Sequence, residues 1–445
     1  MSEQINSDNL AKNVGNKAKE ILGKSTQVLS NKLASYGLPV AKIAMQREKA
    51  MIWVSNNKWR VITGLLISLL IIFYFVAIYN RIPRYLARME VYDINVAGLS
   101  AKNEIMNNDY CLGDFWIASS YKSYLPCTNY TDYASIDSIT HCLKYGARLI
   151  DLDIFNSGVF DTCPDPVVCN GKEVGNWHYT NELLFDDVCR EISMFAFNPR
   201  KCGNSSDPLF LSLNFKTWGN KNTIDKAATI LKKHFSESRR LLCQTNAKYA
   251  FQGRRHLPNG LNIAAEPIKN LINKVVIICT GNIKNTEMDE LCQLYGISPD
   301  ILDEDRPKYR ISDSNEHNFE MKIKTHLQIE NYGFSEAKEL KNFNKGTAGT
   351  NGITKVIPDF KTRSKQNYNC WIPFYYACTF ICMNYNEPTD FMMSYVQRFK
   401  NCSFLLKPYR LRYHKTCIYP PKEQDQSVSF APRTQTIAAG YTMEY

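Results

Sequence analysis

The stretch ARLIDLDIF, residues Ala147–Phe155, places two carboxylates, Asp151 and Asp153, in an otherwise apolar run rich in Leu and Ile. Such a run is typical of a strand buried on both faces, as in a parallel sheet. Similar runs recur after residue 110, separated by helical patterns such as Leu183–Phe195 and Asn222–Phe235. This alternation predicts a parallel α/β sheet, and about eight strands in roughly 300 residues allow a closed (β/α)₈ TIM barrel. The predicted strands are Phe115–Ser119, Arg148–Phe155, Pro166–Cys169, Leu209–Phe215, Lys274–Cys279, Lys355–Pro358, Cys378–Tyr385 and Ser403–Leu406.

A second decisive stretch is Val61–Tyr79, which has nineteen residues without a charge and is closed by Arg60 and Arg81. A helix of this length spans a hydrocarbon core of about 30 Å, so the sequence predicts one transmembrane helix before the barrel. The segment begins too far into the chain, and is too long, for a signal peptide. A buried core helix is the alternative, and the charges at both ends argue against it.

The flanks of this segment predict its orientation. The twenty residues before it carry five Lys and Arg and the twenty after it carry three, which favours a cytosolic N-terminus. All fifteen cysteines lie after the segment, as do three N-x-S/T sites at Asn129, Asn204 and Asn401. We therefore predict a single-pass type II protein with a lumenal or external barrel, in which disulfides are plausible. The many Asn, Lys, Ile and Tyr residues suggest an AT-biased genome, so a viral envelope or inner membrane is one location considered.

Composition limits the remaining classes of function. Apolar residues make up 44% of the chain and charged residues 22%, which excludes wholesale disorder. The net charge is +11, and the first sixty residues carry ten Lys and Arg against four acids. Apolar residues from Leu10 to Leu33 recur at helical spacing, which predicts a basic amphipathic helix on a membrane surface. A solvated helix or a partly ordered tail fits the same pattern. Because the positive charge is concentrated there, we expect no nucleic-acid binding.

Several motifs of the C-terminal part resemble the catalytic barrel of eukaryotic-type phosphoinositide-specific phospholipases C. FWIASSYKSYL (Phe115–Leu125), ARLIDLDIF and PLFLSLNF (Pro208–Phe215) look like strand motifs of the family's X half. GFSEAK (Gly333–Lys338), VIPDFKTRSKQNYN (Val356–Asn369) and FLLKPYRLR (Phe404–Arg412) resemble its Y half, in the family's order. The resemblance covers about residues 110–412 and implies a TIM barrel of the phosphodiesterase type.

The resemblance also divides the chain. The predicted parts are a basic N-terminal region (1–60), a transmembrane helix (61–79), a stalk (80–109), an X-like half (110–280), a polar surface linker (281–330), a Y-like half (331–412) and a disordered tail (413–445).

The family's reaction, which the resemblance implies, is attack of the inositol 2-hydroxyl on phosphorus with diacylglycerol as leaving group. It uses two histidines and a calcium ion held by carboxylates and an Asn. Here the histidine positions fall on Tyr121 and Lys172, and the Asn position falls on Lys122. Tyrosine is a weak proton carrier at neutral pH, and a lysine repels a metal ion. The last histidine of the family's third-strand motif is thus replaced in DPVVCNGK.

The other site positions are partly kept. The family's calcium ligands fall on Asp151, Asp153 and Asn214, which implies a degraded calcium site. Ser335 matches a substrate-binding position, whereas two phosphate-binding lysines fall on Ile278 and Thr280. The family's phosphate-binding Arg falls on Thr362, with Arg363 one place away.

We interpret this pattern as a dismantled site in a protein that does non-catalytic binding or structural work at a membrane, with membrane lipid as partner, such as an inositol phospholipid headgroup. No protein partner is indicated. The alternative is an active phosphoric diester hydrolase that uses calcium, with His178 as displaced catalytic residue and His141 as a remote second candidate. A third class is an attachment protein on an envelope. Lys122 and Lys172 could supply charge in place of a metal, but we expect both to be solvated.

Overall fold

The computed structural model of the chain describes residues 40–92, 94, 96–99, 103–126, 133–158, 164–217, 219–246, 263–297, 320–346, 352–359, 366–412, 434–436 and 442–444. The chain forms two compact units, Met1–Arg81 and Ile82–Tyr445.

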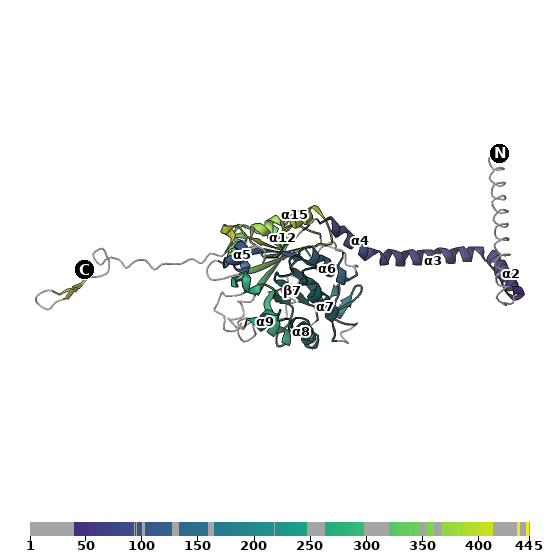
Figure 1. Ribbon diagram of the computed structural model, residues 1–445, viewed down its shortest axis with the longest axis horizontal. Helices are drawn as coiled ribbons and strands as arrows, with labels where there is room; N and C mark the ends of the chain where they lie inside the picture. The colour runs from purple at the N-terminus through teal and green to yellow at the C-terminus, as the bar shows by residue number, and fades with distance from the viewer. Residues whose placement is uncertain are drawn as a thin grey trace, which may run out of the picture. The chain divides into compact units, whose positions relative to one another are not determined.

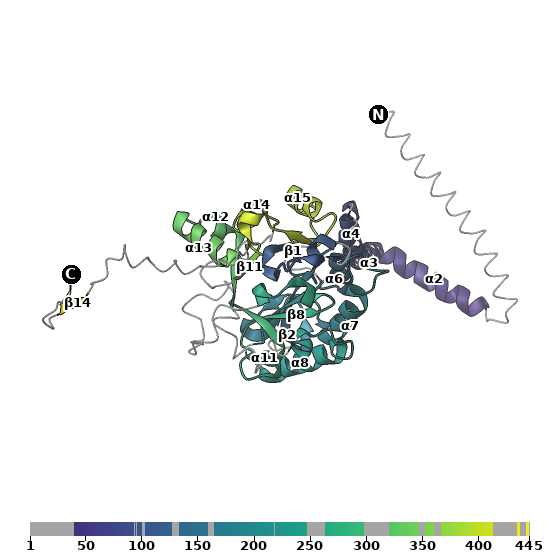
Figure 2. The ribbon, with the colours of Figure 1, turned by 60° about the vertical axis from the view of Figure 1, so that its left-hand side comes forward.

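The second unit is a closed barrel of eight parallel strands, drawn in Figures 1 and 2. The ring closes because β1 pairs with β12 on one side, at Ile117↔Phe380, and with β2 on the other, at Ser119↔Leu149. In ring order the strands are β1 (Phe115–Ser120), β2 (Leu149–Asn156), β7 (Leu209–Phe215), β8 (Val275–Thr280), β9 (Cys292–Ile297), β10 (Glu320–Thr325), β11 (Ile353–Ile357) and β12 (Phe380–Met383). The predicted TIM-barrel fold is confirmed.

Two barrel strands lie inside the interval 281–330, so the prediction of a polar surface linker there is wrong for β9 and β10. β9 pairs with β8 and β10 pairs with β11. In β10, Met321 and Ile323 are buried, while Lys322 and Lys324 alternate with them on the outer side and are less buried. Because polar residues occupy every second position, β10 contains no continuous apolar run, which was the pattern used to predict strands.

Two predicted strands belong to the sheet but not to the ring. β3 (Pro166–Val168) pairs antiparallel with β2 and with β6 (Leu183–Leu184). β13 (Phe404–Leu406) pairs antiparallel with β1. The helical pattern predicted from Leu183 therefore begins with a strand, and α7 starts at Phe185.

Helices cover the barrel and enclose a packed interior. In Figure 2, strands β1, β2, β8 and β11 lie between two groups of helices. One group is α7 (Phe185–Ala196), α8 (Lys221–Phe235) and α11 (Glu287–Leu291), and the other is α12 (His326–Glu330), α13 (Phe334–Lys345), α14 (Trp371–Tyr375) and α15 (Asp390–Arg398). Inside the barrel, the ring of Phe210 lies 5.0 Å from that of Phe380 between centroids. Apolar side chains, aromatic and aliphatic, thus fill the lumen, which is a core and not a pore.

The first unit contains α2 (Val40–Asn56) and α3 (Lys58–Tyr79). Residues Lys58–Ala77 of α3 are long and apolar enough to cross a membrane, and none of this span is buried within the protein. The helix predicted over Val61–Tyr79 is therefore present. The amphipathic helix predicted between Leu10 and Leu33 lies outside the described residues. In the tail, β14 (Thr434–Thr436) and β15 (Thr442–Glu444) form a short antiparallel pair within the segment predicted to be disordered.

Asn204, one of the three glycosylation sequons, is a structural residue. Its side chain is 1% exposed, its oxygen accepts a hydrogen bond from Arg148, and its Nδ2 donates to Ser403 Oγ at 2.6 Å. A glycan there would break this buried network. Asn401 is exposed, and Asn129 lies outside the described residues.

No disulfide occurs among the twelve cysteines that the structure describes, and ten of these are buried. The expected disulfides are therefore not found in this part of the chain. Burial raises the pKa of the Cys142 and Cys378 thiols to about 12 and that of Cys202 to about 11, from a usual value of 9.0. These thiols keep their protons in the folded barrel at a pH where the unfolded chain loses them.

We predict that the barrel loses stability as the pH rises above about 9. A raised folded-state pKa contributes stability that is complete below the unfolded pKa and is lost toward the folded value, at about 1.4 kcal/mol per pH unit for each thiol. Chemical denaturation of the detergent-solubilised chain, followed by tryptophan fluorescence from pH 8 to 10, measures this slope. Cys142→Ala should make the slope shallower, and an unchanged slope would contradict the prediction.

Candidate functional site

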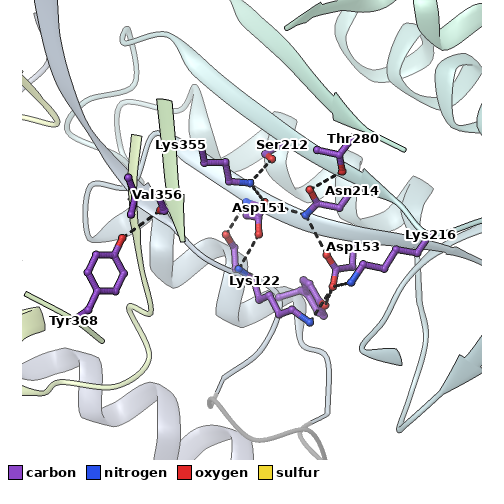
Figure 3. Close-up of polar contacts among 12 residues, drawn as sticks. Lys122, Asp151, Asp153, Ser212, Asn214, Lys216, Thr280, Lys355, Val356 and Tyr368 are labelled. Atoms are coloured by element: carbon purple, nitrogen blue, oxygen red, sulfur yellow. Dashed lines mark hydrogen bonds and ion pairs between the residues drawn. The ribbon is translucent and has the colours of Figure 1, made fainter. Parts of the chain in front are cut away.

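Charged and polar side chains gather between the middle and the C-terminal ends of the barrel strands, and TIM barrels carry their sites at the C-terminal ends. Figure 3 shows the cluster around Asp151 and Asp153 of β2. The side chains come from five strands or from the residues directly after them: Lys122 (β1), Asp151 and Asp153 (β2), Ser212, Asn214 and Lys216 (β7), Thr280 (β8) and Lys355 (β11).

Asp151 is 1% exposed and binds a lysine from the opposite half of the barrel. The Lys355 ammonium forms an ion pair with Asp151 Oδ1 and donates to Ser212 Oγ at 2.7 Å. The backbone N–H of Lys122 donates to Asp151 Oδ2 at 3.2 Å. Both carboxylate oxygens therefore have protein donors.

Asp153 is 2% exposed, and three donors converge on its Oδ2 atom. The ammonium groups of Lys122 and Lys216 lie 3.0 and 3.1 Å from this oxygen. The Tyr124 hydroxyl donates to it at 3.0 Å. Burial and then the charge of Asp153 hold the pKa of Tyr124 well above its usual value, so this tyrosine stays a hydrogen-bond donor.

Asn214 joins the two aspartates. Its Nδ2 donates to Asp151 Oδ1 and to Asp153 Oδ1, at 3.0 Å each. Its Oδ1 accepts from the Thr280 hydroxyl at 3.0 Å. This orientation follows from the hydrogen-bond network, because only the amide nitrogen can donate to the two carboxylates.

Lys355 was not predicted as a site residue. It is fully buried within β11, where burial lowers its pKa but the charge of Asp151 more than offsets this, so that the pKa is raised and the ammonium is retained. A lysine inside a run that otherwise predicts a buried strand was the available signal, because a buried ammonium requires a partner. Ser212, Tyr124 and Lys216 were also missed.

The resemblance implies two histidines and an Asn at Tyr121, Lys172 and Lys122. The structure places these three residues in different environments. Tyr121 is buried among the side chains of the barrel interior, and its backbone N–H donates to Met383 O at 2.9 Å. Lys172 is exposed on the hairpin of β4 (Gly171–Lys172) and β5 (Trp177–His178). Lys122 is buried, so the expectation that it is solvated is wrong. Its left-handed backbone (φ 41°) turns the chain after β1, and its ammonium reaches Asp153 and Asn170 Oδ1, the latter at 3.1 Å.

His178 forms a pair with Glu182. Its side chain is 9% exposed, Nδ1 lies 2.6 Å from Glu182 Oε1, and Nε2 lies 3.3 Å from Asn176 Oδ1. The next residue, Tyr179, donates its N–H to the carbonyl of Asn170, whose side chain contacts Lys122. His178 is thus linked through the hairpin to the cluster. His141 lies on α6 (Ile136–Lys144), where its Nδ1 lies 2.8 Å from Asp137 O and its ring contacts that of Tyr145.

The remaining predicted site residues do not join the cluster. Ser335 is exposed in the first turn of α13, and Ile278 lies in the barrel interior. Arg363 and Thr362 lie outside the described residues.

The residues present do not fit a calcium ion. Calcium needs six to eight oxygen ligands. All four oxygens of Asp151 and Asp153 accept hydrogen bonds or ion pairs from the protein, and Asn214 presents a nitrogen to both aspartates. Within the described ranges there is no group of three or more His, Cys, Asp or Glu that could hold a metal ion.

We predict that Asp153→Asn destabilises the barrel by about 3–5 kcal/mol, because it leaves buried ammonium groups without their carboxylate. The matched control is Asp165→Asn, which removes the exposed partner of Lys226 and should cost at most about 1 kcal/mol. Denaturant unfolding of the full chain compares the two. Equal losses would show that the Asp153 pairs contribute no more than a surface pair.

Comparison with known proteins agrees with this fold. The family model "Phosphatidylinositol-specific phospholipase C, X domain" matches residues 108–259. The human 1-phosphatidylinositol 4,5-bisphosphate phosphodiesterase gamma-2 is 34% identical over 110 residues, which are 24% of this chain and 7% of that protein. The Danio rerio delta-3-A enzyme of the same name is 27% identical over 124 residues, 26% of this chain and 14% of that protein. The alignments thus span only a small part of these relatives.

The fold similarity extends further than the sequence similarity. The crystal structure of L. pealei PLC21 matches with a TM-score of 0.50 and 17% identity, over 68% of this chain and 38% of that one. The Y-like half inferred from sequence lies outside the residues that the family model matches, and it stays a prediction. Residues 108–259 are therefore similar to the X domain of phosphatidylinositol-specific phospholipases C, and the chain has the TIM-barrel fold of phospholipase C-like proteins.

Proposed function

We propose that this protein is a membrane-anchored, phospholipase C-like barrel that binds the headgroup of an inositol phospholipid without hydrolysing it. The proposal rests on the residues found at the two positions where the family has its catalytic histidines. Tyr121 is buried in the barrel interior and Lys172 is exposed on a hairpin, so neither position offers an imidazole to the aspartate cluster. Loss of one general acid or base typically costs about 10²–10⁴ in rate, and here both positions are changed.

Anchoring is supported by α3. Its span Lys58–Ala77 has a mean hydropathy of 2.3 and none of it is buried within the protein, as expected of a helix that faces lipid. A membrane anchor in the same chain as a headgroup-binding barrel raises the local concentration of lipid ligand, which compensates for weak affinity. The exposed sequon at Asn401 is compatible with the type II orientation, whereas Asn204 gives it no support.

The ligand class follows from the relatives. Those described above are named for phosphatidylinositol 4,5-bisphosphate. In this barrel, Lys216 is the most accessible of the three clustered lysines, with 23% of its side chain exposed. An ammonium group at a strand end is a suitable contact for a phosphate group.

A second candidate function is phosphodiester hydrolysis by a rearranged site. The favouring observation is the His178–Glu182 pair, because a carboxylate that holds one ring nitrogen leaves an imidazole oriented for proton transfer. In this alternative His178 acts as the general acid or base and Glu182 orients it.

We predict binding without turnover. The full chain, reconstituted in nanodiscs, is tested for release of water-soluble inositol phosphate from phosphatidylinositol and its bisphosphate, with calcium and with a chelator. Binding is measured separately by titration with glycerophosphoinositol. The first proposal predicts saturable binding, weakened by Lys216→Met, and no product above that of empty nanodiscs.

The variants His178→Gln and His141→Gln separate the two functions. Turnover that His178→Gln abolishes and His141→Gln leaves intact would replace the first proposal with the second. Absence of both binding and turnover in a folded, reconstituted chain would contradict both.

A further inference from the structure

The two buried aspartates require positive charge. An ionised carboxylate in a protein interior is stable only when it is paired and hydrogen-bonded. Asp151 and Asp153 are 1% and 2% exposed, and among the described residues the groups that bring positive charge to them are Lys122, Lys216 and Lys355. In the family that the chain resembles, a calcium ion has this task.

We propose that lysine ammonium groups, those of Lys122 and Lys355 above all, take the place of the family's metal ion, so that the barrel is complete without a divalent cation. The proposal concerns the charge balance of the site and goes beyond headgroup binding, because it holds whether or not the barrel takes a ligand.

The position of Lys122 supports this replacement. The motif match places it where the family has an Asn that binds calcium. Its ammonium does not extend into solvent but turns to Asp153 Oδ2 at 3.0 Å and Asn170 Oδ1 at 3.1 Å. The residue adopts a left-handed conformation, with φ 41°, which Asn tolerates better than Lys. A lysine in a backbone conformation that suits Asn indicates that the side chain is kept for its charge.

Lys355 supports the replacement from the other side of the barrel. Its side chain is 2% exposed and reaches Asp151 from β11, which is separated from β2 by β1 and β12 on one side of the ring and by β7 to β10 on the other. Ser212 provides a second acceptor at 2.7 Å. A lysine that crosses the lumen to a buried carboxylate contacts the same oxygen, Asp151 Oδ1, that Asn214 contacts. A cation could bind there only after displacing the ammonium.

The alternative is that these are ordinary structural ion pairs with no relation to a metal position. The two hypotheses predict different binding of divalent cations when the lysines are removed. Freed carboxylates at a metal position should recruit a divalent cation, whereas freed carboxylates elsewhere should only repel each other.

The test compares the full chain in detergent micelles with the double variant Lys122→Asn/Lys355→Met. The first change restores the family's Asn at a position whose backbone suits it, and the second removes the ammonium while keeping the length of the side chain. Thermal unfolding is followed in a chelator and in millimolar calcium, with magnesium as a second cation. Lys226→Met, which removes an exposed ion pair with Asp165, is the control.

We expect calcium to leave the midpoint of the natural chain and of the control within about 1 °C of the chelator value, because no site is open to bind it. The double variant should unfold at a lower temperature in chelator and should regain part of that loss in calcium. A calcium-dependent rise in the natural chain would overturn the proposal. So would a folded double variant that calcium does not stabilise. If the double variant fails to fold under either condition, the single variant Lys122→Asn is measured in the same way, and a folded single variant that calcium does not stabilise would overturn the proposal.

Discussion

The barrel depends on finding partners for two carboxylates that β2 carries into its interior. Asp151 and Asp153 point to the same side of the strand because side chains alternate along it. Both are almost completely buried, and unpaired charges there would cost several kcal/mol each. The surrounding strands and the residues that follow them contribute three ammonium groups, one phenol and one amide, all within hydrogen-bond distance of these two carboxylates. The polar end of the barrel is thereby a closed network and not an open cation site.

This network also connects distant parts of the sequence. Lys355 lies 204 residues after Asp151, and their ion pair crosses the barrel between its first and second halves. The β1–β2 and β1–β12 pairings close the ring beside it. Long-range contacts of this kind form late in folding, since the loop-closure entropy has to be overcome first.

Sequence patterns predicted the fold well where a strand is apolar throughout. Leu209–Phe215 has the same bounds in the sequence and in the structure, and the long apolar helix is found with a slightly earlier start at Lys58. β9 and β10 were not predicted: in β10 lysines alternate with buried apolar residues, and in β9 a buried Gln293 and a Gly296 interrupt the apolar run. The site was predicted only in part. Asp151, Asp153 and Asn214 do lie together, but the direction of the Lys122 side chain depends on a left-handed turn and on Asp153. Neither can be derived from a motif, and nor can the long-range partner of Lys355.

The account predicts one feature of the site that can be seen directly. A crystal structure of the chain grown with calcium would show, at the ends of β2 and β7, whether nitrogen or metal lies beside the aspartates. Our account predicts the Lys355 ammonium on Asp151 and the Lys122 ammonium on Asp153, with no anomalous scatterer between them. A calcium ion bound by Asp151 and Asp153, with both lysines turned away, would contradict it.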